Sequence, residues 1–354
     1  MNKHNFTAGP CILPQQVLKQ ASEAVLNFNN DNLSLIEISH RSVPIVAVME
    51  KARKLVLELL KLENKGYSVL FLQGGASLEF LMTPYNLLKE NGKAVYLDTG
   101  AWSAKAIKEA KLLGTIDVIA SSKDKNYNYI PKGYSIDSNA DYFHCTSNNT
   151  IYGTQIKSFP KTDGLLVCDM SSDIFSRELD FTQFDLIYAG AQKNMGPAGA
   201  TLVVIKEDIL GKTGRQIPSM LDYQIHIGKD SMFNTPSVFA VYVSMLTLQW
   251  LKDLGGISAI EKINNAKATL LYNEIDSNPL FEGAAAKEDR SNMNATFLLT
   301  DSSLQEKFDS LCKKAGIVGI NGHRSVGGYR ASMYNALPLE SVQVLVDVMH
   351  NLSK

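Results

Sequence analysis

The 354-residue chain has few of the residues from which metal centres and disulfide frameworks are built. Its four cysteines, Cys11, Cys145, Cys168 and Cys312, are scattered along the chain without a CxxC pair. This spacing predicts neither a zinc site nor a disulfide framework. We therefore expect reduced, mostly buried thiols and no metal in the functional site.

The chain also lacks the tracts that are typical of membrane proteins and nucleic-acid binding proteins. Its formal net charge is -1, and no basic tract stands out. No apolar run approaches the roughly 20 residues that are needed to cross a bilayer. The amino-terminal residues Met1–Phe6 lack a signal-peptide core. We expect a cytoplasmic protein that acts on small molecules and binds neither nucleic acid nor a membrane.

What the chain does contain, without repeats or low-complexity linkers, is an alternation of apolar strands and helices. Strands are expected at residues 67–72, 94–97, 116–119, 165–169, 184–189 and 200–205, and helices at residues 46–62, 78–88 and 101–113. This order predicts an α/β fold, with a largely parallel sheet that is covered by helices on both faces.

The pattern changes near residue 255. From there we expect a smaller α+β domain with helices at 257–275, 304–315 and 339–352 and a strand at 294–299. A chain of this length, with 45% hydrophobic residues, is large enough for two domains.

Lys193 lies in the glycine-rich run 190–199, between two apolar strands. About six residues separate it from the second strand, too few for a right-handed crossover, so this strand is expected to be antiparallel to the first. A lysine on a turn is more often a surface residue without a function. A lysine held between two buried strands is also suited to form a Schiff base with an aldehyde cofactor, pyridoxal 5′-phosphate.

Two further features match the other needs of this cofactor. Strand 165–169 ends in Asp169, whose carboxylate would face the crevice at the carboxyl ends of the strands and keep a pyridine nitrogen protonated. The turn Gly74-Gly75-Ala76-Ser77 opens a helix, where free amides and the helix dipole favour a phosphate. It is not a Walker A loop, because no Gly-Lys-Ser/Thr follows. Trp102, just past the next strand, could stack on a flat ring, although a tryptophan is more often a core residue.

Arginine and histidine placement predicts a substrate with several negative charges. His40 and Arg41 follow an apolar segment, and the run 322–330 contains two arginines and a histidine among three glycines. The planar guanidinium of arginine suits carboxylates and phosphates. A solvated surface loop can have the same composition.

Seven short motifs, in order along nearly the full chain, resemble the phosphoserine aminotransferase family. They are Asn5-Phe6-Thr7-Ala8-Gly9-Pro10, Ile38-Ser39-His40-Arg41-Ser42, Gly74-Gly75-Ala76-Ser77, Asp169-Met170-Ser171-Ser172, Gln192-Lys193-Asn194, Asn234-Thr235-Pro236 and Gly322-His323-Arg324-Ser325-Val326-Gly327-Gly328-Tyr329-Arg330-Ala331-Ser332. The resemblance implies the class V branch of fold-type I pyridoxal phosphate enzymes, with a mostly parallel seven-stranded sheet. It implies a large domain of residues 16–254, a small domain of residues 1–15 and 255–354, and a homodimer with active sites at its interface.

The resemblance also implies individual roles. Lys193 would bind the cofactor aldehyde and move the substrate α-proton, and Asp169 would pair with the pyridine nitrogen. Further cofactor contacts are expected from Ala76, Ser77, Trp102, Thr150, Ser171 and Gln192, and from Asn234 and Thr235 of the partner subunit. Arg330 would hold the α-carboxylate. The distal anion would be held by His40, Arg41, and, from the partner subunit, His323 and Arg324.

The implied reaction is the reversible transfer of an amino group between O-phospho-L-serine and 2-oxoglutarate, with ping-pong kinetics. A second activity on 4-phosphohydroxy-L-threonine, in the pathway that makes the cofactor, is also implied. Two positions depart from the family pattern: Ser77 stands where some members have arginine, and Ser237-Val238 stands where many have proline and threonine. Both changes could alter cofactor affinity.

The sequence leaves three alternative functions to consider. A cysteine desulfurase usually has a histidine before the lysine and a cysteine on a mobile loop, whereas here Gln192 precedes Lys193 and Cys312 lies in a predicted helix. A transaminase that acts on alanine and glyoxylate would not need a second anion site. A protein that binds the cofactor without turnover would not need the full set of arginines.

Overall fold

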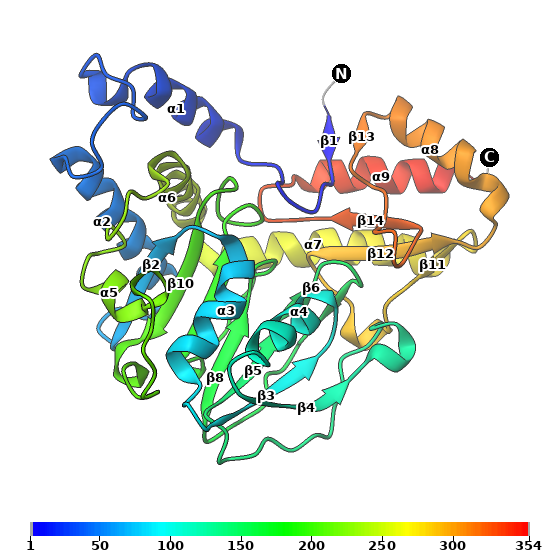
Figure 1. Cartoon of the computed structure of the whole chain (residues 1–354). Coiled ribbons are helices and arrows are strands. Elements are labelled where there is room, and N and C mark those ends of the chain that lie inside the picture. The colour runs from blue at the N-terminus through cyan, green and yellow to red at the C-terminus, as the bar shows by residue number, and fades with distance from the viewer. Residues whose placement is uncertain (1–2, 353–354) are drawn as a thin grey trace.

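A seven-stranded mixed sheet forms the centre of the larger part of the molecule in the computed structural model, which describes residues 3–352 (Figure 1). Its strands are β2 (Tyr67–Leu72), β3 (Lys93–Asp98), β4 (Thr115–Ser121), β5 (Tyr142–Thr146), β8 (Leu165–Asp169), β9 (Leu186–Gly190) and β10 (Thr201–Lys206). The spatial order is β2-β10-β9-β8-β5-β3-β4. Only β10 is antiparallel to its neighbours. The predicted mostly parallel sheet, and the antiparallel strand after the Lys193 turn, are confirmed.

Helices cover both faces of this sheet, because successive strand side chains point to opposite faces. On one face, Phe143 and Ile187 share a core with α2 (Val43–Leu59) and α6 (Val238–Asp253). On the other face, Tyr142 and Tyr188 share a core with α3 (Gly75–Leu87), α4 (Ala101–Ala110) and α5 (Tyr223–Ile227). Helix α1 (Gln15–Leu26) packs on α6 through Val17 and Ala21. Because helices cover both faces of the sheet, a ligand reaches the sheet at the ends of its strands.

The carboxyl-terminal part has its own core, built around a three-stranded antiparallel sheet. The sheet contains β11 (Phe281–Gly283), β12 (Asn294–Leu299) and β14 (Tyr329–Ser332), and it packs with α7 (Gly256–Ser277), α8 (Gln305–Lys314) and α9 (Leu339–Asn351). Phe6 joins this core, since β1 (His4–Asn5) pairs with β13 (Ile317–Val318). The domain boundaries expected at residues 15/16 and 254/255 stay a prediction, and residues 1, 2, 353 and 354 lie outside the described range.

Two smaller features complete the fold. A hairpin of β6 (Asn148–Asn149) and β7 (Thr154–Gln155) extends from the end of β5. Within residues 3–352, no helix is both long enough and apolar enough to cross a membrane.

Candidate active site

A cavity of about 740 Å³ lies at the carboxyl ends of the parallel strands, between the large sheet and the carboxyl-terminal part. Parallel α/β sheets commonly bind ligands at this edge. The structure brings most of the predicted site residues to the wall of this cavity: Ala76, Ser77, Trp102, Thr150, Asp169, Ser171, Gln192, Lys193, His323, Arg324 and Arg330. Residues separated by more than 250 positions in the sequence therefore share one site.

Lys193 lies on the tight turn between β9 and β10. The carbonyl of Ala191 accepts hydrogen bonds from the backbone amides of Lys193 and Gly196, both at 2.8 Å. The Lys193 Nζ donates to Thr150 Oγ1 at 3.1 Å and lies 5.8 Å from the centroid of the Trp102 ring. Burial lowers the pKa of Lys193 to about 8, while the nearby Asp169 carboxylate opposes the shift. A larger fraction of this amine is thus neutral near pH 7 than in an ordinary lysine, and the neutral form is the nucleophile and base.

Asp169 is the last residue of β8, and its side chain is buried. Its Oδ1 accepts a hydrogen bond from the Ser171 backbone amide at 2.9 Å. Burial raises the pKa of Asp169, while the hydrogen bonds from Ser171 and the charge of Lys193 oppose that rise. A cationic group placed against this carboxylate would favour its ionised form. The side chain is therefore suited to pair with a protonated ring nitrogen.

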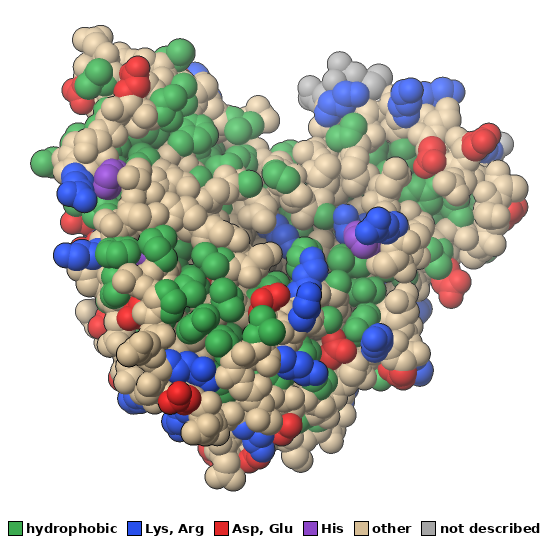
Figure 2. All heavy atoms as spheres, in the orientation of Figure 1, with side chains coloured by type: hydrophobic (Ala, Val, Ile, Leu, Met, Phe, Trp, Pro, Cys, Tyr) green, Lys and Arg blue, Asp and Glu red, His purple; other side chains and the backbone are tan. Residues whose placement is uncertain are grey.

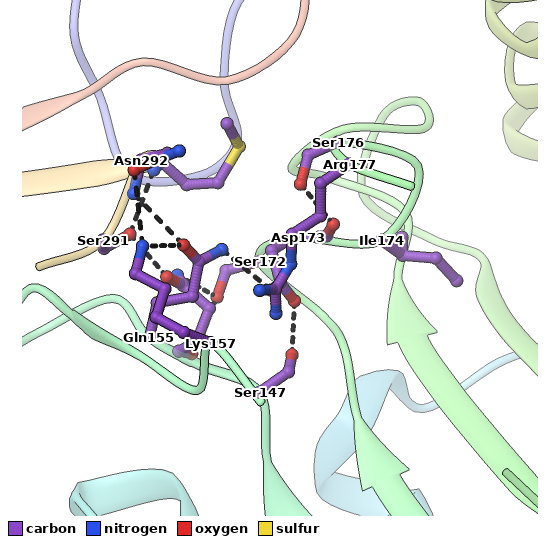
Figure 3. Close-up of polar contacts among 12 residues, drawn as sticks. Ser147, Gln155, Lys157, Ser172, Asp173, Ile174, Ser176, Arg177, Ser291 and Asn292 are labelled. Atoms are coloured by element: carbon purple, nitrogen blue, oxygen red, sulfur yellow. Dashed lines mark hydrogen bonds and ion pairs between the residues drawn. The ribbon is translucent and has the colours of Figure 1, made fainter. Parts of the chain in front are cut away.

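A buried polar network supports the turn that follows Asp169 (Figure 3). Asp173 accepts hydrogen bonds from Ser147 Oγ and, at 3.0 Å, from Gln155 Nε2. Gln155 belongs to the β6–β7 hairpin, which carries Thr150 at its tip. Asp173 thus ties the turn after Asp169 to the hairpin that contacts Lys193. The sequence interpretation missed Asp173, although this second carboxylate follows Asp169 by only four residues.

The turn before α3 has the backbone that close approach of a ligand requires. Gly74 and Gly75 have φ values of 96° and 66°, in the left-handed region that favours glycine. A β-carbon on Gly74 would lie 2.6 Å from the Leu78 side chain. The first amides of an α-helix have no acceptor within the helix, so those of Ala76 and Ser77 are suited to an anion.

Three buried polar atoms on the cavity wall have no hydrogen-bond partner within residues 3–352. They are Trp102 Nε1, Thr146 Oγ1 and Arg330 Nε. Leaving such a group unpaired costs about 1–3 kcal/mol, and most buried polar groups in proteins are paired. Their convergence on one cavity indicates that the site is built for a polar ligand.

His323 and Arg324 lie on a loop of the carboxyl-terminal part. The carbonyl of His323 accepts hydrogen bonds from the amides of Val326 and Gly327 at 2.9 and 2.8 Å. Partial burial and the charges of Arg330, Arg324 and Lys105 lower the pKa of His323. Both residues line the cavity of their own chain, and the expectation that they act in the site of the partner subunit stays a prediction. Val326 of this loop and Trp102 of α4 both pack against the buried cluster of Tyr127, Ile151 and Tyr152, which holds the loop near α4.

Four predicted residues do not line this cavity: His40, Arg41, Asn234 and Thr235. His40 is half-buried and Arg41 is exposed. The carbonyl of Thr235 accepts a hydrogen bond from Nε2 of Gln73 at 2.7 Å. Gln73 directly precedes the Gly74 turn. The expected roles of these four residues stay predictions.

The cysteines do not support a lyase with a cysteine nucleophile. Cys312 is buried in α8, and burial raises the pKa of its thiol to about 12. Cys145 and Cys168 are buried in the sheet, and Cys11 is the one cysteine that is partly exposed.

Comparison with known proteins agrees with this geometry. Residues 4–345 match the family described as Aminotransferase class-V. The chain is 72% identical to a phosphoserine aminotransferase of Flavobacterium psychrophilum, and the match covers 99% of each chain. The phosphoserine aminotransferase structure from Bacillus circulans subsp. alkalophilus has a TM-score of 0.95 at 43% identity, over 99% of this chain and 98% of that one. A PLP-bound phosphoserine aminotransferase structure from Trichomonas vaginalis has a TM-score of 0.93 at 35% identity, over 99% and 100% of the two chains.

Proposed function

This chain belongs to the class-V aminotransferase family, and we propose that it transfers the amino group between O-phospho-L-serine and 2-oxoglutarate, giving 3-phosphohydroxypyruvate and L-glutamate. The observation that carries the proposal is one cavity in which Lys193 and Asp169 lie together with His323, Arg324 and Arg330. Two relatives, at 72% and 71% identity, are phosphoserine aminotransferases and are matched over 99% of their length. This reaction places the enzyme in serine biosynthesis.

The residues around the cavity fit pyridoxal 5′-phosphate. Lys193 offers an amine of lowered pKa, Asp169 offers a buried carboxylate, and the start of α3 offers amides for a phosphate. The unpaired Trp102 Nε1 and Thr146 Oγ1 are donors that a polar cofactor would engage. When bound, the cofactor supplies an aldehyde that joins an amine and a protonated ring that withdraws electrons from the substrate α-carbon.

Lys193 and Asp169 divide the proton chemistry between them. With the cofactor bound, the Lys193 Nζ would be the base that removes the substrate α-proton and the acid that returns it. Thr150 Oγ1, which accepts a hydrogen bond from this Nζ, keeps the amine directed into the cavity. Asp169 would keep the ring nitrogen protonated, because a buried carboxylate stabilises a cation that is placed against it.

Substrate recognition follows from the arginines. Arg330 is partly buried beside Lys193, and its planar guanidinium suits a bidentate contact with the α-carboxylate. His323 and Arg324 lie at the same cavity and suit the distal phosphate or carboxylate. Phosphoserine and glutamate each carry two anionic groups, so one pocket can accept both in turn.

We expect the arginine variants to separate the two anion sites. Arg330→Ala should lower kcat/KM about 10- to 100-fold for phosphoserine and for alanine as donors, because both have an α-carboxylate. Arg324→Ala should cause a loss of this size for phosphoserine alone. The measurement is a donor panel with 2-oxoglutarate as acceptor, including the wild-type enzyme. Equal losses for alanine and phosphoserine in Arg324→Ala would contradict the assignment.

We further propose a homodimer that brings His40 and Arg41 of the partner subunit to the distal-anion site. The segment that carries them is flanked by exposed apolar side chains, with Ile36 64% and Val43 84% exposed. Figure 2 shows hydrophobic side chains at the surface around α1 and α2. Apolar surface of this kind is typical of an interface. The same interface is expected to bring Asn234 and Thr235 to the partner's cofactor phosphate.

Mixing two inactive variants tests this dimer. Lys193→Ala and Arg41→Ala, co-expressed with different tags, should give mixed dimers in which one of the two sites has both residues intact. Random pairing makes about half of the dimers mixed, so about a quarter of the wild-type activity should return. The two variants mixed without subunit exchange are the control. No recovery in purified mixed dimers would show that Arg41 does not act across the interface.

The implied activity on 4-phosphohydroxy-L-threonine and the cytoplasmic location both stay predictions. Phosphohydroxythreonine in the same donor panel would test the first.

A further inference from the structure

Lys105 is a cation of the active-site cavity to which the proposed reaction assigns no role. It lies on α4, and it lines the same cavity as Lys193, His323 and Arg324. Its Nζ is 4.5 Å from the centroid of the Trp102 ring. The side chain is exposed, so a ligand that enters the cavity can reach it.

No carboxylate neutralises this lysine. None of the ion pairs among residues 3–352 involves Lys105, although Glu109 follows one helical turn later. Asp169, at the base, is the one carboxylate residue among the described residues that line the cavity. The cavity wall therefore holds an excess of positive charge, which favours a ligand with several negative charges.

Lys105 comes from the larger part of the molecule, whereas His323 and Arg324 come from the carboxyl-terminal part. Lys105 belongs to the large sheet's helix α4, and the pair belongs to the loop before β14. Val326 of this loop and Trp102 of α4 pack against the same buried cluster of Tyr127, Ile151 and Tyr152. The charge of Lys105 acts on the His323 imidazole, so the two side chains lie within electrostatic range. Figure 2 shows basic side chains and a histidine gathered at this surface, near α4 and β14.

We propose that Lys105 is a specificity-determining residue that favours a substrate with a distal phosphate over one with a distal carboxylate. This inference rests on the proposed function and deepens it, since it concerns the same site. A lysine is a point charge without the fork that selects carboxylate geometry. Its attraction to an anion grows with the ligand charge, so a phosphate dianion gains about twice the energy of a carboxylate monoanion. Because affinity depends exponentially on energy, doubling the interaction energy squares the factor by which Lys105 raises the affinity for the ligand.

Lys105→Gln in the holoenzyme tests the proposal. We expect kcat/KM to fall about 5- to 10-fold for phosphoserine and only about 2- to 3-fold for glutamate, measured as separate half-reactions. Lys105→Arg should keep the wild-type preference. Lys108→Gln is the matched control, because it removes an exposed charge from the same helix outside the cavity.

A role limited to supporting Trp102 predicts a different result. Lys105→Gln would then weaken cofactor binding and lower the rate with both donors by the same factor. Equal losses for phosphoserine and glutamate, or a loss in Lys108→Gln as large as in Lys105→Gln, would overturn the proposal.

Two readouts do not depend on which donor the enzyme uses. Inorganic phosphate should inhibit the wild-type holoenzyme more strongly than Lys105→Gln, assayed with alanine as donor. The pKa of His323, followed by NMR, should rise in Lys105→Gln, because one of the charges that lowers it is gone. An unchanged pKa and unchanged phosphate inhibition would refute the role of Lys105. Failure of the wild-type enzyme to use phosphoserine, with both effects present, would instead refute the proposed substrate.

Discussion

Replacing Lys193 with alanine should lower turnover by about 10⁴-fold or more and should remove the absorption band of the imine between lysine and cofactor. The variant loses both the amine that joins the aldehyde and the base that moves the α-proton. Among the residues that the structure describes, the Lys193 Nζ makes only one hydrogen bond to another side chain, to Thr150 at 3.1 Å, so we expect the fold to persist. Absorption spectra and steady-state rates with phosphoserine measure both effects.

Chemical rescue separates lost chemistry from lost structure. A small primary amine added at high concentration should restore part of the activity of Lys193→Ala, because it can carry the proton in place of the missing side chain. Borohydride reduction of the wild-type holoenzyme, followed by mass spectrometry, should place the cofactor on Lys193. Wild-type turnover by the alanine variant, or cofactor found on another lysine, would refute the assigned role.

Asp169→Asn should lower kcat by about three orders of magnitude, equivalent to ~4 kcal/mol of transition-state stabilisation. A neutral pyridine is a poor electron sink, and an amide cannot keep the ring nitrogen protonated. The substitution preserves shape, since the asparagine oxygen can still accept the hydrogen bond from the Ser171 amide. The loss should therefore appear in the chemical step, measured in single-turnover experiments.

Asp173→Asn provides the comparison for Asp169→Asn. It neutralises the second buried carboxylate of the same turn, which does not line the cavity. Its hydrogen bonds to Ser147 and Gln155 support the β6–β7 hairpin, so its main effect should be a lower Tm. A nearly normal rate for Asp169→Asn would show that another group protonates the ring.

The strands of the sheet were predictable because most are continuous apolar runs, buried on both faces. Strands at 67–72, 165–169 and 294–299 were predicted with the bounds that the structure shows. Strand β5 was not predicted, because the buried polar residues His144 and Thr146 interrupt its apolar pattern. Helix α6 was not predicted either. It is apolar on most sides and buries Ser244 and Thr247, so it lacks the one-sided periodicity of a surface helix.

The candidate site was predictable where its residues stand at strand ends. Lys193, Asp169 and the Gly74 turn each follow an apolar strand, and parallel strands bring such ends to one edge. The position of His323 and Arg324 was not predictable in this way. It depends on how Val326 of the loop before β14 packs on the cluster of Tyr127, Ile151 and Tyr152, which lie more than 170 positions earlier in the chain. Asp173 was missed because its partners come together only in the folded chain.

The order of the cavity residues along the chain has a consequence for biosynthesis. The predicted cofactor contacts that line the cavity lie between Ala76 and Lys193, whereas Arg330 lies more than a hundred positions later in the chain. Translation proceeds from the amino terminus, and domains fold largely as they emerge. A polypeptide that is still attached to the ribosome can therefore contain these cofactor contacts before Arg330 has been synthesised. During synthesis the cofactor contacts are therefore complete before the residue that would bind the substrate α-carboxylate exists.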